Sequence, residues 1–409
     1  MLAQEKLEKI SLAIDKKKKE VRIKRAISKT FVFNPLWKRA QFPCNTTHTD
    51  KDILHFYNTQ TFDNQRQFGS QIYKQFSDDL NVTHVLAIAP TQSGKTGSML
   101  AIIKEFNDTH ASHRVDIQNV FIFTGHSSKE WTTQTKLRFP SHMANRILHR
   151  NQLKLFIQQV QDLDNILIIF DESHIANKFG QTLFSLYNSL GFFNIKRLYT
   201  KNIKIVHFTA TPHSLLQHTH IWQNSLKVVH MQVPDNYVSF QHYLLNKQIL
   251  PCKPLHGNYE HIRQLKDVID IHDPFFHIIR TPRGNAHKEL IQDFKLVFKQ
   301  FNFKFISEPF DLKQQDSIDT LLENKPPVHT FIFIIDKLRC AKSISIKHVQ
   351  ICYDRFVSTP NYDSVLQGLL GRCTGYHTHT SQIRIFTFIQ LIHTQHFSAK
   401  EVHNILLPT

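Results

Sequence analysis

Residues 83–96, THVLAIAPTQSGKT, carry the strongest structural signal in the chain. The apolar run at 85–89 predicts a buried strand that leads straight into a polar loop ending in Lys95 and Thr96. Apolar residues at helical spacing over 97–106 predict a helix directly after this loop. A strand, a loop ending in GKT and a helix form a phosphate-binding pattern, in which backbone N–H groups surround the phosphates and the lysine reaches the β and γ oxygens.

The loop predicts ATP as a ligand and Mg²⁺ as a cofactor, because the Thr96 hydroxyl is placed to complete a magnesium shell. Two residues depart from the usual pattern: Ala89 stands at its first glycine, and Gln92 stands where a further glycine is common. An ordinary strand–turn–helix without a ligand is the weaker alternative, since both flanking elements fit. The candidate ATP-binding residues are Ala89, Pro90, Thr91, Gln92, Ser93, Gly94, Lys95 and Thr96.

Length and composition indicate a two-domain protein with a polyanionic partner. The 409 residues suffice for two domains with their own cores. A formal net charge of +17 points most simply to nucleic acid, although a generally basic proteome would also produce it. Five scattered cysteines without a CxxC pair favour a reducing compartment. Without a membrane-length apolar run or a signal-peptide core, we expect an intracellular, cytoplasmic protein with no membrane contact.

The N-terminal segment is the most basic part of the chain. Over residues 1–40, twelve lysines and arginines stand against four acidic residues, a net of +8. Three interpretations of the helical pattern at 1–29 remain open: a solvated basic helix, a nuclear localisation signal, or an arm that contacts nucleic-acid phosphates. Residues 34–52, with two prolines and an NTTHTD run, predict a linker.

Three further apolar runs, at 119–124, 165–170 and 203–208, predict strands. They are continuous rather than alternating, as burial on both faces requires. Helical or irregular segments separate them, which predicts an α/β fold with a parallel, doubly wound sheet. A helix over 57–80, with an apolar face, is expected before the first strand.

Ligands of such sheets bind at the carboxyl ends of the strands, and polar residues follow two of the runs there. Asp171 is suited to hold Mg²⁺ through water, and Glu172 is suited to orient and deprotonate an attacking water. Thr209 and Thr211, in TATP, can hydrogen-bond the end of the carboxylate strand and relay its state. DESH alone could be a helix cap and TATP alone a turn. Their order after the GKT loop, each at the end of a strand, favours a catalytic site instead.

The segments APTQSGKT, DESH and TATP resemble motifs I, II and III of superfamily-2 helicases and translocases of the DExH type. A looser resemblance connects the chain with helicase-like proteins of large DNA viruses. The resemblance covers roughly residues 60–395. It implies two RecA-like domains with ATP between them and single-stranded nucleic acid across their top. It also implies a coupling role for His174 and an adenine-reading glutamine in the helix before the first strand, with Gln67 and Gln71 as candidates.

The same resemblance extends to the segments that contact nucleic acid in the family. TGHSSKEWTTQTK at 124–136 is similar to motif Ia, LHRNQL at 148–153 to motif Ib, TPRG at 281–284 to motif IV, and DKLRCAKSIS at 336–345 to motif V. A helix at 286–301 and strands at 275–280, 331–335 and 383–388 are expected in this second part. The candidate nucleic-acid contacts are Thr124, Ser127, Arg150, Thr281, Arg283 and Lys342.

QGLLGRCTG at 367–375 resembles motif VI, with Gln367 in a coupling role and Arg372 as the arginine that reaches the γ-phosphate. The segment departs from the family form QxxGRxxR. Gln367 lies one residue further from the GR pair, and Gly375 stands at the position of the second arginine. Arg339, in an unusually basic motif V, is a candidate substitute.

Four parts are expected: a basic extension and linker (1–55), a first RecA-like domain (56–230), a connector (231–265) and a second RecA-like domain (266–409). The expected function is an ATP-dependent helicase or translocase on DNA or RNA. A packaging or terminase ATPase and a catalytically weak nucleic-acid-binding scaffold are the alternatives. The 27 histidines lack structural-zinc spacing, so we interpret them as surface or loop residues.

Overall fold

The computed structural model describes residues 48–108, 113–125, 129–173, 182–212, 222–307, 311, 318–335, 338, 344–360, 362–377 and 380–393. Contacts divide the chain into two units. The first is built on residues up to Met231, and the second on residues from Gln232 onward together with the loop 89–94. No described helix is long and apolar enough to cross a membrane.

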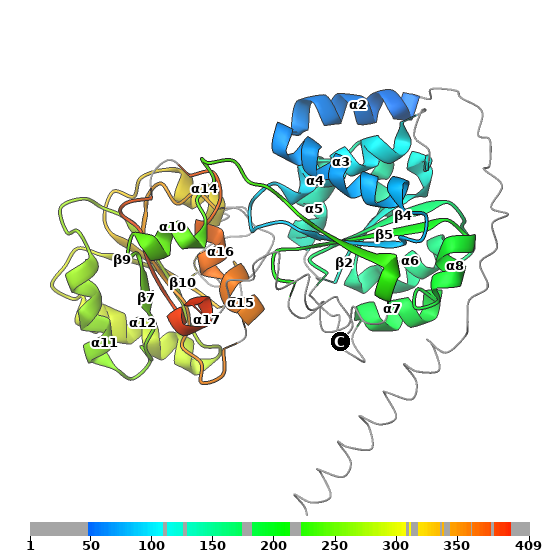
Figure 1. Cartoon of the computed structure of the whole chain (residues 1–409). Helices are drawn as coiled ribbons and strands as arrows, with labels where there is room; N and C mark the ends of the chain where they lie inside the picture. The colour runs from blue at the N-terminus through cyan, green and yellow to red at the C-terminus, as the bar shows by residue number, and fades with distance from the viewer. Residues whose placement is uncertain are drawn as a thin grey trace, which may run out of the picture. The chain divides into compact units, whose positions relative to one another are not determined.

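The first unit is a six-stranded sheet in the order β3-β2-β4-β5-β1-β6, in which every neighbouring pair is parallel (Figure 1). β2, β4 and β5 are buried along their whole length, as the continuous apolar runs predict. The strands are β1 (His84–Ile88), β2 (Val120–Thr124), β3 (Ile147–His149), β4 (Ile166–Asp171), β5 (Ile203–Thr209) and β6 (Leu226–His230).

Helices cover both faces of this sheet. Phe68 of α3 meets Phe208 of β5 edge to face, whereas Phe156 of α6 and Tyr187 of α7 pack against Phe170 of β4. Large aromatic rings therefore join each helical layer to the central strands. The helices are α2 (His48–Gln60), α3 (Asp63–Asp78), α4 (Lys95–Asn107), α5 (Lys129–Leu137), α6 (Leu153–Val160), α7 (Thr182–Leu190) and α8 (Ile195–Thr200).

The helix expected over 57–80 is interrupted near its start. Its apolar face is buried, but α2 ends at Gln60 and α3 begins at Asp63. The Phe62 backbone N–H donates to the Gln65 side chain at 3.1 Å, and Arg66 donates to the Thr61 hydroxyl at 2.8 Å. These local bonds stabilise a new helix N-terminus, which hydrophobic periodicity alone does not reveal.

The second unit is also a parallel six-stranded sheet, in the order β7-β12-β11-β8-β10-β9. The strands are β7 (Ile249–Pro251), β8 (Phe276–Arg280), β9 (Lys304–Ser307), β10 (Thr330–Ile334), β11 (Val349–Tyr353) and β12 (Arg384–Thr387). The helices are α10 (Phe240–Leu245), α11 (Tyr259–Arg263), α12 (Asn285–Val297), α14 (Ile318–Glu323), α15 (Tyr362–Gln367), α16 (Leu369–Cys373) and α17 (Ile389–His393).

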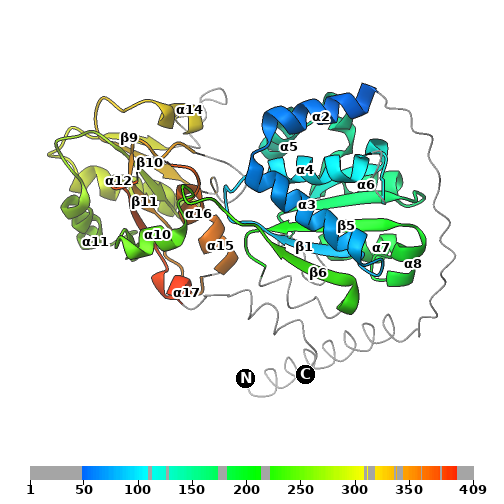
Figure 2. The ribbon, with the colours of Figure 1, turned by 45° about the horizontal axis from the view of Figure 1, so that its top comes forward.

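Two hydrophobic clusters show that α12 and α16 cover opposite faces of this sheet. Leu290 and Phe294 of α12 pack with Phe331 and other residues in one cluster. Leu369 and Leu370 of α16 belong to the other cluster, which β8, β10 and β11 also enter. Figure 2 shows the strands between α12 with α11 on one side and α16 with α15 on the other.

The expected α/β class, with two mainly parallel sheets, is confirmed. Sequence patterns missed five strands, β3, β6, β7, β9 and β11. β7 falls in the segment expected to connect the domains (231–265), and it pairs with β12 of the second sheet. β6 lies at the end of the expected first domain (56–230), and it pairs with β1. The domain limits expected from the sequence stay predictions.

Candidate nucleotide-binding site

The candidate phosphate loop follows β1 and contains two residues with left-handed backbone conformations. Gly94 has φ 97°, a value that L side chains rarely adopt, which explains its glycine. Gln92 has φ 57°, so the position where a glycine is common in the pattern indeed requires a positive φ. Ser93 closes the turn, with its N–H and its hydroxyl both donating to the Pro90 carbonyl, at 3.3 and 2.8 Å.

Lys95, the first residue of α4, forms an ion pair with Glu172. Their Nζ and Oε1 atoms are 3.0 Å apart, and the two side chains are only 13% and 3% exposed. A lysine whose partners are the phosphate oxygens of a ligand is expected to be solvated in the nucleotide-free protein. The structure corrects this, because the lysine compensates a buried carboxylate. This ion pair brings the DESH and GKT segments into direct contact within the first unit.

Asp171 ends β4 and is held by Trp131 of α5, whose indole Nε1 donates to Oδ2 at 2.8 Å. The backbone N–H of Glu172 donates to the other oxygen, Oδ1, at 3.0 Å. Burial and the neighbouring Glu172 charge raise the pKa of Asp171 to about 6, against the lowering effects of Lys95 and Trp131. Trp131 was not foreseen, since only the fold brings it next to a residue 40 positions away.

The electrostatics of this carboxylate pair fit a divalent cation. Two adjacent acidic side chains share a buried site with one lysine, and a cation would relieve the repulsion that raises the pKa of Asp171. Thr96, the other predicted Mg²⁺ residue, is half-buried and accepts a hydrogen bond from Arg138 Nη1 at 3.4 Å. Hydroxyl and carboxylate oxygens are suitable ligands for Mg²⁺.

The DESH and TATP segments are joined through Ser173. Its N–H donates to the Phe208 carbonyl at 3.0 Å, and its hydroxyl donates to the Phe170 carbonyl at the same distance. Thr209 and Thr211 are buried, and the Thr209 hydroxyl bonds both the N–H and the carbonyl of Thr211, at 3.0 and 3.1 Å. A displacement of the carboxylates can thus reach the end of β5 through one backbone bond.

A buried glutamine lies against the helix that carries the lysine, but it is not one of the two that the sequence suggested. Gln67 and Gln71 are exposed, whereas Gln65 is 4% exposed. A Cβ added to Gly97 would lie 1.9 Å from Gln65 Oε1, so Gly97 allows this amide to approach α4. Gln65 differs from its neighbours by its burial. The sequence did not reveal this difference, because several glutamines lie close together in this segment.

Arg372, the predicted arginine of motif VI, lies in α16 and is 3% exposed. Its Nη2 donates to the carbonyl of Gln367 at 3.2 Å, so these two predicted residues are in contact. Gly375 has φ 119° and exchanges two backbone hydrogen bonds with Val238, at 2.8 and 3.0 Å. An arginine at position 375 would be strained in this conformation, which accounts for the departure from the family pattern.

The loop residues grouped with the second unit contact the α16 end. The Gln92 amide donates to the carbonyls of Gly371 and Arg372, at 3.1 and 2.7 Å. The hydroxyls of Thr91 and Thr374 are 2.7 Å apart. The Gln92 side chain thus adds contacts that a glycine could not make.

The predicted nucleic-acid contacts fall into exposed and buried groups. Arg150, in the 3-10 helix η3 (Arg150–Gln152), and Arg283 are exposed. Thr124 ends β2 and is buried, and Thr281 follows β8 with its hydroxyl donating to the Ile334 carbonyl at 3.1 Å. Four predicted site residues lie outside the described residues: Ser127, His174, Arg339 and Lys342.

No protein-family model matches the chain. It is 27% identical over 336 residues to an uncharacterised protein of Acanthamoeba polyphaga mimivirus, covering 78% of this chain and 82% of that protein. It is similar in structure to Mss116, a DEAD-box helicase, bound to single-stranded RNA and AMP-PNP, with a TM-score of 0.50 and 10% identity over 89% of this chain and 81% of that chain. The Escherichia coli DEAH/RHA helicase HrpB has a TM-score of 0.49 and 12% identity, over 82% of this chain and 43% of that chain. The likeness to Mss116 concerns the fold, two α/β domains that each contain a parallel sheet.

Proposed function

We propose that this protein is an ATP- and Mg²⁺-dependent helicase or translocase of the DExH type, which moves along a DNA or RNA strand. The observation that carries the proposal is the 3.0 Å ion pair between Lys95 of the phosphate loop and Glu172 beside Asp171. A structural scaffold does not require a buried cluster of two carboxylates at a strand end, where ligands of parallel sheets bind. The structural relative bound to RNA and AMP-PNP supports the same function.

The ion pair also suggests how nucleotide binding prepares the general base. In the proposed reaction, the β- and γ-phosphate oxygens take over the Lys95 ammonium, and Glu172 loses its compensating charge. A carboxylate that is 3% exposed and has lost the ion pair with Lys95 becomes a better acceptor for the proton of an attacking water. Because Lys95 exchanges Glu172 for the phosphates only when nucleotide binds, Glu172 can act as the general base only in the nucleotide-bound state.

Thr96 and Asp171 are the residues that would hold Mg²⁺. When bound, the cation supplies positive charge to the phosphate oxygens. Trp131 keeps the Asp171 carboxylate oriented through its 2.8 Å hydrogen bond. Arg372, or Arg339, supplies a further cation to the γ-phosphate, and the candidate motif residues of both units contact the strand without reading its sequence.

The test is a single-turnover ATPase assay with and without single-stranded DNA or RNA. We expect nucleic acid to stimulate the parent protein, and Glu172→Gln to retain ATP binding while hydrolysis falls by about 10²–10⁴-fold. Glu105→Gln, a change on α4, is the matched control and should hydrolyse ATP at the parent rate. Hydrolysis by Glu172→Gln at the parent rate would refute the assignment of the base.

Two alternatives have specific consequences. A nucleic-acid-binding scaffold is favoured by Gly375, which stands at the position of the usual second arginine and has a φ of 119° that would strain one. Such a scaffold would bind strands without turning over ATP. A packaging or terminase ATPase would be expected to carry a nuclease domain with several separated carboxylates. QGLLGR in the C-terminal third favours the helicase instead.

A further inference from the structure

The second unit has a cavity of about 90 Å³ at the carboxyl edge of its sheet. Arg280 and Pro282, at the end of β8, form one wall, and residues 353–356, at the end of β11, form another. Residues 253–256, which follow β7, and Leu290 of α12 complete it. Pro282 belongs to the segment similar to motif IV, but none of the candidate ATP-binding residues or candidate nucleic-acid contacts named above lines this cavity.

The cavity lies where the sheet topology opens a crevice. β8 and β11 are parallel neighbours, but the chain leaves them in opposite directions. After β8 it passes through α12 to β9 at one edge of the sheet, and after β11 it passes through α15 and α16 to β12 on the other side. The two connections cover opposite faces. Ligands of open α/β sheets bind at such switch points, at the carboxyl ends of the strands.

Hydrogen bonds connect the walls of the cavity, so the cavity is formed in the absence of a ligand. The Tyr353 hydroxyl accepts from the Lys253 N–H at 2.7 Å and donates to the Lys253 carbonyl at 2.8 Å. His256 contacts Glu289 of α12, with Nε2 and Oε2 2.8 Å apart. A preformed cavity loses little conformational entropy on binding.

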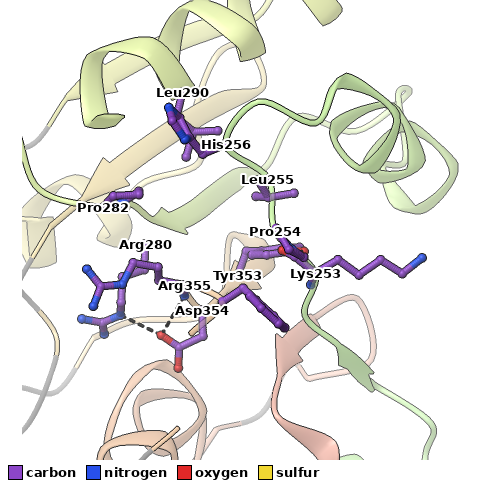
Figure 3. A pocket seen from close by; sticks show the side chains of 11 residues that line it. Lys253, Pro254, Leu255, His256, Arg280, Pro282, Leu290, Tyr353, Asp354 and Arg355 are labelled. Atoms are coloured by element: carbon purple, nitrogen blue, oxygen red, sulfur yellow. Dashed lines mark hydrogen bonds and ion pairs between the residues drawn. The ribbon is translucent and has the colours of Figure 1, made fainter. Parts of the chain in front are cut away.

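Two guanidinium groups and one carboxylate determine the net charge of the cavity lining. Arg280 Nε lies 2.8 Å from Asp354 Oδ1, and Arg280 Nη2 donates to the Leu338 carbonyl at 3.2 Å. Arg355 is half-buried, and its backbone N–H donates to the same carboxylate oxygen. Figure 3 shows the side chains of Arg280 and Arg355 on the same side of the pocket, while Lys253 extends away from them. The excess positive charge favours an anion, and planar guanidinium groups suit phosphate.

The size of the cavity and the residues at its rim restrict which ligands can bind. A cavity of about 90 Å³ is far smaller than the roughly 300–1,000 Å³ that enclose a whole small molecule, so only one group enters. A phosphomonoester has a single covalent connection to lead out of such a cavity, whereas a phosphodiester continues in two directions. Phe356 lies among the lining residues with 43% of its surface exposed, and its ring is 5.9 Å from that of Phe388. An exposed ring of this kind offers a stacking surface to a base.

We propose that this cavity binds the phosphate of a phosphomonoester nucleotide, either a free nucleoside monophosphate or the 5′-phosphorylated end of a nucleic-acid strand. Arg355 and Arg280 face the phosphate, and Phe356 stacks on the base. The site lies within the second unit and does not rest on the proposed ATPase.

The experiment measures the affinity of the full chain for two oligonucleotides of one sequence, with a 5′-phosphate or a 5′-hydroxyl, and for AMP. We expect the phosphorylated strand to bind about tenfold more tightly, and Arg355→Gln to reduce this ratio to about one. Arg263→Gln, which removes an exposed arginine of α11, is the matched control and should leave the ratio unchanged. Phe356→Ala should weaken both phosphorylated ligands.

The oligonucleotide readout is a ratio, so general electrostatic attraction to the strand cancels in it. AMP affinity is measured separately, and AMP bound at the phosphate loop contributes equally to Arg355→Gln and to the control Arg263→Gln. If Arg355→Gln weakens AMP but leaves the oligonucleotide ratio unchanged, the ligand is the free nucleotide. The proposal fails if Arg355→Gln changes neither the oligonucleotide ratio nor the affinity for AMP, including the case in which it weakens the two oligonucleotides equally and leaves AMP binding unchanged. Thermal unfolding of each variant checks that the fold is retained.

Discussion

At the level of single residues, Asp171 and Glu172 share a buried strand end with one lysine, and this crowding sets the pH dependence of stability. The pKa of Asp171 is raised from 3.8 to about 6 by burial first and by Glu172 second. Such a shift corresponds to roughly 3 kcal/mol between the two protonation states. For a carboxyl with a raised folded-state pKa, the stabilising contribution is complete below pH 3.8 and is lost as pH rises through about 6.

Asp171→Asn should therefore stabilise the nucleotide-free protein at pH 8, by about 1–3 kcal/mol, while abolishing Mg²⁺-dependent hydrolysis. At pH 5 the gain should be smaller, because the parent Asp171 is then largely protonated. Urea unfolding at both pH values, with magnesium removed, measures the difference. Asp162→Asn, which removes an exposed carboxylate of the same unit, is the control. An equal gain at pH 5 and pH 8 would show that ionisation of Asp171 is not the cause.

Trp131→Phe tests the hydrogen bond that holds the same carboxylate. Its loss should raise the pKa of Asp171 further, because the indole lowers it in the parent protein. The acid side of the ATPase pH profile should then move to higher pH, with the rate at pH 8.5 changed less. Trp37→Phe serves as a control for tryptophan loss. An unmoved acid side, together with a rate reduced equally at every pH, would assign Trp131 a packing role only.

At the level of elements, the contact between α3 and α4 connects the helix before β1 to the helix that carries Lys95. Gly69 makes this approach possible, since an added Cβ would lie 2.6 Å from Ala101 Cβ and 3.0 Å from its backbone carbon. Backbone cannot move aside as a flexible side chain can. The close packing therefore couples the position of α4, and with it the lysine, to α3.

Gly69→Ala should destabilise the protein by about 1–3 kcal/mol, although alanine is the better helix former. Chemical denaturation measures the loss, and Ser70→Ala on the same helix is the control. Intrinsic helix propensity alone would make Gly69→Ala stabilising. Such a result would show that α3 and α4 can move apart without loss of stability.

At the level of the whole molecule, the proposed reaction would take a cation from the second unit. An arginine supplied to the γ-phosphate in this way contributes about 10³–10⁵ in rate in related phosphate-loop enzymes. Gly375 cannot supply it, and Arg372 is buried in the described conformation with its guanidinium donating to Gln367. Its delivery would have to accompany a conformational change driven by nucleotide and strand.

Arg372→Ala and Arg339→Ala should therefore be compared with their double variant at saturating nucleic acid. We expect Arg372→Ala to lower the ATPase rate at least 10²-fold, with ATP affinity changed less, because the charge acts mainly in the transition state. Arg384→Ala is the control on the same unit. Normal turnover by both single variants and by the double variant would exclude this mechanism.

Much of this protein could be predicted from contiguous residues. The apolar runs that form β1, β2, β4, β5, β8 and β10 are continuous because strands buried on both faces need no polar alternation. The order of GKT, DESH and TATP, each at a strand end, indicated a parallel sheet and the edge where its polar residues would gather. β6 (LKVVH) and β7 (ILP) escaped detection, because neither contains the long continuous apolar run that marks the predicted strands.

Tertiary structure decided the contacts between distant residues. Lys95 was expected to be solvated and is instead paired with Glu172, and Trp131 reaches Asp171 although no local pattern marks it. Gln65, rather than Gln67 or Gln71, is the buried glutamine beside α4. Sequence patterns report which face of an element is buried, whereas the partner of each buried polar group depends on where the other elements lie. Burial then makes such a partner obligatory, because an unpaired charge in the interior costs more free energy than the fold can spare.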